Sequence, residues 1–379
     1  MPTNLENLQN TVIELYKARK EYVKNARPFL NEYFKEKGRK GLEEFKDSSF
    51  LYIRSFDGDV GIRPFSDKNF WNSPDIELSP MEGTETYTTS LEAGKIYNIR
   101  CQLHNRGDLN IPFPKVELFL TDPTLGFDTR FARQIGLGQY QGLLPPNASR
   151  FVDFTYQIPP SESGHKCLFA RTFSFSPLDK PIDVFDLNPL IDRHIGQKNL
   201  NIAAQSESFS FSLLHLPNAN DRIDFVPMNT LEVATLRHPL IADYKIKEKH
   251  NEIFISKRNL SIKENQHELS LVQRQSGFQI LAKGFGASIR EQANIFRQVE
   301  QAVKAINKGE ANHQQYRETF KEFRSMNREI QRTTFDLKIP DLGLKKGEAT
   351  GFSIVCTNKV TGRIKGGITL IVTGGRQRA

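Results

Sequence analysis

The first stretch of the chain has apolar residues that recur in alternating steps of three and four. The pattern runs from Leu5 to Phe34 and predicts an amphipathic helix with a seam close to heptad spacing. Pro28 lies inside the pattern and predicts a kink or a division into two helices. Because one copy of the chain would leave part of this seam uncovered, we expect it to form an interface. The residues expected at that interface are Leu8, Val12, Leu15 and Tyr22.

A different pattern, with a period of two, follows between Lys95 and Ile202. Tyr97, Ile99 and Cys101 alternate with the residues between them, as in a strand with one face buried. Clusters of turn-forming residues separate several such runs. Short strands with this punctuation and no intervening helix favour an antiparallel sandwich over a parallel sheet.

A second set of predicted strands begins at Phe209–Leu213 and ends with the pair Gly351–Cys356 and Gly366–Val372. Between positions 280 and 335 the pattern returns to steps of three and four, first around Phe296 and again around Phe320. Two helices joined by a short loop, an αα-hairpin, are therefore predicted inside the second set of strands.

The net charge of +8 is unevenly distributed along the chain. Residues 276–379 hold 18 Lys and Arg against 9 Asp and Glu, so the rest is about neutral. A basic surface is expected on the hairpin, and nucleic-acid binding through it is an alternative function. Tyr316, Phe320 and Phe323 have helix-core spacing, however, which favours a solvated helix face over a stacking surface. The residues expected on this basic surface are Arg297, Lys304, Arg324 and Arg328.

The cysteines and the first residues of the sequence indicate the cellular compartment in which we expect the protein. Three cysteines without CxxC spacing fit a reducing environment. The first residues lack a basic segment followed by an apolar run, and no eighteen apolar residues follow one another, so we expect a cytoplasmic protein without a membrane span. Cys101 and Cys167 lie on two predicted strands that a sandwich can bring within disulfide range. Two buried thiols are the favoured interpretation.

The only neighbourhood that suggests an enzyme contains His165, Cys167 and His194, with Asp192 beside the last. It can be drawn as a metal site or a Cys–His pair, which gives a second alternative function. No compact metal-ligand spacing, nucleophile elbow or phosphate-binding loop occurs, so histidines with structural roles are favoured. We expect no catalytic residue, no metal and no cofactor.

Three short motifs carry a family resemblance. They are NRG at positions 105–107, GHKCL at 164–168 and DRHIGQKN at 192–199. Together they resemble bacterial immunoglobulin-like β-sandwiches of the CARDB-like, or cell-adhesion-related, kind over about residues 70 to 205. Residues 348–372 look like the end of a further sandwich. The resemblance implies an interaction or structural module.

We therefore expect a mainly β protein with two immunoglobulin-like antiparallel β-sandwiches, an N-terminal helix and a helical hairpin inserted in the second sandwich. The expected divisions are a helical segment at 1–46, a first sandwich at 47–205 and a second at 206–379, with the hairpin at about 286–332. The expected function is that of a non-enzymatic structural or interaction protein, a component of a bacterial or phage-like filament, particle or injection apparatus. Protein partners and self-association follow from that expectation.

Overall fold

The computed structural model describes residues 49–65, 69–81, 90–162, 164–174, 176, 179–236, 239–248, 255–264, 269–274 and 277–375. The predicted helical segment 1–46 and its interface residues Leu8, Val12, Leu15 and Tyr22 lie outside this part of the chain. Within it, the prediction of a mainly β chain with several sheets is confirmed.

The N-terminal sheet pair consists of two sheets that share one apolar core. The β4 sheet contains β1 (Leu51–Tyr52), β2 (Ile76–Pro80), β4 (Ile96–Asn105) and β10 (Ala148–Gln157), and the β6 sheet contains β6 (Lys115–Thr121), β8 (Arg133–Gln139), β12 (Cys167–Phe173) and β13 (Ile195–Lys198). All pairings within these two sheets are antiparallel. Every second side chain of β4 is buried, as its alternating sequence predicts, and packs against residues of β6 and β12.

Short elements complete this region. β3 (Ser90–Leu91) pairs with β11 (Gly164–His165), and β5 (Ile111–Pro112) pairs with β9 (Leu143–Leu144). Single 3-10 turns cover Thr129–Phe131 and Pro160–Glu162. The edge strand β8 lies close to β10 because Gly136 and Gly138 have no side chain: a Cβ at either position would lie within 2.7 Å of a side-chain atom of Phe154 or Val152.

The C-terminal sheet pair is larger and rich in phenylalanine. The β22 sheet contains β14 (Leu200–Ala204), β16 (Ala219–Pro227), β17 (Lys245–Ile246), β19 (Leu269–Arg274), β20 (Gly277–Ala282), β22 (Glu348–Asn358) and β23 (Ile364–Thr373). The β15 sheet contains β7 (Thr124–Leu125), β15 (Ser208–His215), β18 (Leu260–Glu264) and β21 (Gln331–Lys338). Phe211, Phe335 and Phe352 lie in the core between the two sheets.

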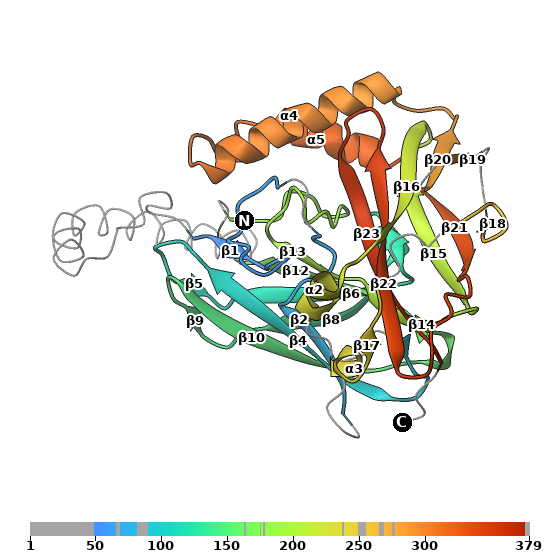
Figure 1. The fold of residues 1–379 in the computed structure, drawn as a ribbon. Coiled ribbons are helices and arrows are strands. Elements are labelled where there is room, and N and C mark those ends of the chain that lie inside the picture. The colour runs from blue at the N-terminus through green and yellow to red at the C-terminus, as the bar shows by residue number, and fades with distance from the viewer. Residues whose placement is uncertain are drawn as a thin grey trace, which may run out of the picture.

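Helices cover parts of these sheets. α2 (Thr230–Thr235) and α3 (Pro239–Ala242) follow β16, and α4 (Ile289–Asn307) and α5 (Arg317–Asn327) lie between β20 and β21 in the chain. Figure 1 shows α4 and α5 side by side along one side of the molecule. Their apolar faces pack on each other and on Ile191 and Leu216, one from each sheet pair.

Strand pairing and side-chain hydrogen bonds, in addition to the chain connection, join the two sheet pairs. β7 comes from the N-terminal half but pairs in parallel with β15, and β14 pairs in parallel with β23. β14 therefore belongs to the β22 sheet, although it precedes residue 206, where the second sandwich was expected to begin. The division of the chain between residues 205 and 206 stays a prediction. Asn199 Nδ2 donates to the carbonyl oxygens of both Thr124 and Gly367. These contacts make one continuous body of the two sheet pairs.

Candidate functional site

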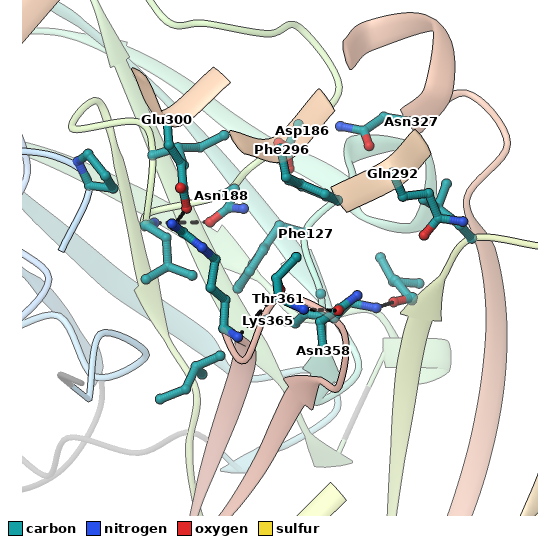
Figure 2. A pocket seen from close by; sticks show the side chains of 18 of the residues that line it. Phe127, Asp186, Asn188, Gln292, Phe296, Glu300, Asn327, Asn358, Thr361 and Lys365 are labelled. Carbon is teal, nitrogen blue, oxygen red and sulfur yellow. Dashed lines mark hydrogen bonds and ion pairs between the residues drawn. The ribbon is translucent and has the colours of Figure 1, made fainter. Parts of the chain in front are cut away.

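The candidate site is a cavity of about 440 Å³ where the helices meet both sheet pairs. We call it the junction cavity. Figure 2 shows Phe127 at its centre, with Phe296 and Glu300 of α4 on one side and, on the other, Thr361 of the β22–β23 turn and Lys365 of β23. Its volume lies within the range of about 300 to 1,000 Å³ that is usual for small-ligand sites, and pockets of this kind often lie where folding units meet.

Local sequence places α4 at this cavity. Ser288 and Glu291 form a reciprocal capping box that fixes where the helix begins. Ile295, Val299 and Val303 then form the stripe that packs into the helical core. Residues one position beyond this stripe, Phe296 and Glu300, consequently border the cavity.

The cavity wall combines aromatic rings with amide and carboxyl groups. The rings that border it belong to Phe65, Phe70, Phe127, Phe296 and Phe323. The amide groups belong to Asn188, Gln292, Asn327 and Asn358. A wall of this composition offers flat apolar faces together with hydrogen-bond donors and acceptors.

Asp186 is the most perturbed acid at the cavity. Its residue surface is 7% exposed, and its backbone pairs with that of Asp128. Burial, and after it the nearby carboxylates of Asp183 and Asp128, raise the pKa of Asp186 well above its usual range. The uncharged form of this side chain is therefore favoured relative to that of an exposed aspartate.

Two ion pairs border the same cavity. Lys365 Nζ lies 2.6 Å from Asp221 Oδ2, and Arg363 pairs with Glu300 of α4. The second pair joins the β22–β23 turn to the helix. Asp221 is fully buried, and its other oxygen, Oδ1, accepts no hydrogen bond from any residue that the structure describes. The surface of this oxygen is closed to the cavity as well as to solvent, so it carries the free-energy cost of an unsatisfied buried acceptor and is not a contact for a ligand.

The four residues of the predicted basic surface lie at separate places on the two helices. Lys304 borders the junction cavity, and Arg297 borders a neighbouring groove of about 940 Å³. Arg324 is half-buried and its guanidinium contacts the carbonyl of Ile182. Arg328 is exposed and its carbonyl accepts a hydrogen bond from Arg130. The structure thus brings only Arg297 and Lys304 to a concave surface.

The side chains of His165, Cys167 and His194 each contact different groups in the structure. Cys167 is fully buried; Gln197 Nε2 lies 3.5 Å from its sulfur, and burial raises the pKa of its thiol far above the usual range. His165 lies on β11, where its ring contacts that of Phe209. No hydrogen bond joins Cys167 to either histidine among the described residues.

His194 lies in a buried ionic cluster. Its Nδ1 is 2.7 Å from Asp192 and its Nε2 is 3.0 Å from Asp179, which also pairs with Arg193 at 2.6 Å. Both ring nitrogens can donate only in the imidazolium form. Burial alone would lower the pKa of His194, but Asp192 and Asp179 outweigh it and raise that pKa. The cluster is a structural centre beside β13.

Cys101 and Cys167 are free thiols, as is Cys356, and all three are buried. This agrees with the favoured interpretation of two buried thiols. Among the described residues no group of three or more His, Cys, Asp or Glu is placed to hold a metal ion. No helix of the described part is long and apolar enough to cross a membrane.

Sequence patterns did not predict most of the residues that border the cavity. Asp186, Asn188 and Asp221 belong to no motif, and they converge only because a loop of the N-terminal half meets β16. The sequence shows that phenylalanine is abundant, but it does not show which phenylalanines lie in the core and which border the cavity. The one usable signal was the basic stretch on α4, which contains Arg297 and Lys304.

Comparison with known proteins gives only distant likenesses. No family model matches the chain, and no curated protein matches it. Among solved structures, the CARDB domain of a Pyrococcus furiosus protein, in complex with di-metal ions, is 14% identical, with a TM-score of 0.21, over 38% of this chain and 95% of that domain. A tip adhesin of Pseudomonas aeruginosa is 7% identical, with a TM-score of 0.16, over 79% of this chain and 98% of that one.

An enzyme is also among the distant likenesses. The transglutaminase of red sea bream is 7% identical, with a TM-score of 0.18, over 79% of this chain and 31% of that one. All three likenesses concern the β fold alone.

Proposed function

We propose that this protein is a non-enzymatic structural or interaction protein made of two immunoglobulin-like antiparallel β-sandwiches, the second carrying the α4–α5 hairpin. We further propose that it is made in the cytoplasm as a component of a larger bacterial or phage-like assembly. The observation that carries the proposal is the interlocking of the sheet pairs through β7, β14 and Asn199. A body whose parts cannot turn against each other holds binding surfaces at fixed separations, which repeated assembly requires.

The helical hairpin adds to this rigidity. Arg130, in the N-terminal half, donates to the carbonyl oxygens of Asn327 and Arg328 where α5 ends. A cation at a helix C-terminus is favourable because carbonyl groups are left unpaired there. Asn307, the last residue of α4, accepts from Arg193 and donates to the carbonyl of Arg63. Both helices are thus fixed to the N-terminal sheet pair at these ends.

Free sheet edges support self-association. β8 pairs with β6 on one side and lies at the end of its sheet in the described structure. Apart from Arg133 at its start, it contains no charged residue and no proline, which commonly protect an edge, and Leu137 near its middle is 62% exposed. An edge of this kind offers backbone donors and acceptors to a strand of another chain.

The buried thiols favour this function over an enzyme. A nucleophilic cysteine needs an accessible thiolate, whereas burial raises the pKa of Cys167 and leaves its side chain without access to solvent.

Native size-exclusion of the untagged chain from cells that make it tests the proposed function. We expect the chain to elute with an assembly much larger than its 43.3 kDa monomer. A stable monomer, with no partner after native pull-down, would contradict the proposal.

A further inference from the structure

The junction cavity opens toward a second concave surface. The groove of about 940 Å³ lies between the N-terminal half of α4 and the β22–β23 turn, and it shares Phe296, Thr361 and Arg363 with the cavity. A ligand that fills the cavity can therefore extend past Phe296 into the groove.

A stripe of cations follows this opening. Arg290 and Arg297 border the groove and Lys304 borders the cavity, at intervals of seven residues, which place them on one face of α4. All three are exposed, and in the described structure none of them forms an ion pair or a side-chain hydrogen bond. Glu291, the nearest acid on the groove, already accepts the Ser288 amide in the capping box. The opening thus favours an anion.

The interior favours a different chemistry from the opening. Phe127 and Phe296 present rings, while Asn188 and Asn327 present amides. A flat ring with hydrogen-bonding groups on its edge would stack on the phenylalanines and form hydrogen bonds with these amides.

These requirements exclude simpler ligands. A fatty acid would satisfy the cations and the rings but would give the amides of Asn188 and Asn327 no further hydrogen-bond partner. A sugar phosphate would satisfy the cations and the amides but would not cover the aromatic wall. A heterocyclic base joined to phosphate meets all of them.

We propose that the junction cavity binds a mononucleotide, with its base against Phe127 and Phe296 and its phosphate at Arg297 and Lys304. The Arg guanidinium and the Lys ammonium are the usual donors to phosphate oxygens, the first in bidentate geometry. The site needs no catalytic group and is separate from the sheet edges.

Isothermal titration of the full chain tests this site, with AMP, GMP, CMP and UMP as probes. We expect at least one of them to bind with a Kd below about 1 mM, a modest affinity for a site of this size. Its nucleoside, ribose 5-phosphate and inorganic phosphate should each bind at least about tenfold more weakly, because each lacks part of the recognition.

Variants of the stripe residues distinguish specific binding at this site from non-specific attraction by positive charge. Arg297→Gln and Lys304→Gln should each weaken nucleotide binding about tenfold. Arg317→Gln is the matched control, because Arg317 is exposed on α5 and borders neither the cavity nor the groove. The inference is wrong if none of the four nucleotides binds, if inorganic phosphate or ribose 5-phosphate binds as tightly as the nucleotide, or if both stripe variants bind like the wild type.

Discussion

Trp71 Nε1 donates a hydrogen bond to Thr369 Oγ1 over 3.0 Å, although 298 positions separate the two residues. The same hydroxyl accepts a second bond from Asn72 Nδ2 at 2.6 Å. Next to it, Gly367 leaves room for the indole: a Cβ there would lie 2.3 Å from Trp71. The only tryptophan of the chain therefore joins the N-terminal sheet pair to β23.

Thr369→Val should lower the free energy of unfolding by about 2 kcal/mol, because it leaves one buried donor, Trp71 Nε1, and one partly buried donor, Asn72 Nδ2, without this acceptor. Urea unfolding followed by Trp71 fluorescence and by far-ultraviolet circular dichroism measures this. Both signals should change together, since the sheet pairs unfold as one body. Thr319→Val on α5 is the control and should change stability little. Separate transitions for the two signals in the wild type would contradict the interlocked architecture.

The cysteines should be inert in the folded protein. Burial raises the pKa of the Cys101, Cys167 and Cys356 thiols, so each is protonated and shielded. A colorimetric thiol reagent should modify none of them within hours and all three after addition of urea. Rapid modification of Cys167 in the folded state would support the enzyme alternative. A Cys101–Cys167 linkage in non-reducing mass spectrometry would show that the two thiols are bonded.

His194 should make stability depend on pH. Its pKa is raised in the folded state, so its contribution is fully present below the usual histidine value of about 6.5 and is lost as pH rises through the folded value. His194→Asn should cost about 3 kcal/mol at pH 6, because it leaves Asp179 and Asp192 buried with one cation fewer. The cost should be smaller at pH 9. An equal cost at both pH values would show that the imidazolium charge does not matter.

Asp186 should also make stability fall as pH rises, but for a different reason. Its pKa is raised in the folded state, so the unfolded chain ionises first as pH rises above the usual aspartate value of about 4. The folded protein then loses stability relative to the unfolded chain. Asp186→Asn should therefore have a higher Tm than the wild type at pH 7, with a smaller difference at pH 4. Asp243→Asn, at an exposed position, is the control.

The sequence predicts those parts of the fold that depend on neighbours in the chain. The alternation around Ile99 predicts β4, and the spacing of Phe296, Val299 and Val303 predicts the helix that the structure has as α4. These patterns record which face of one element is buried. They contain no information on which element covers it.

The parts that could not be predicted depend on distant pairings. Nothing in Thr124–Leu125 indicates a strand that pairs with β15, and nothing near Trp71 indicates Thr369 as its partner. The junction cavity is of the same kind, because Asp186 and Asp221 meet only after both sheet pairs have formed. A pattern analysis identifies the basic residues of α4 but not the concave surface beside them.

Sedimentation velocity of the full chain over a hundredfold range of concentration tests the proposed assembly most directly. The heptad-like seam at the start of the sequence predicts that the wild type associates as concentration rises, and that Val12→Asp combined with Leu15→Asp remains monomeric. Circular dichroism should show the variant folded. A wild type that stays monomeric throughout would contradict the account, and a variant that assembles like the wild type would exclude the seam as the interface.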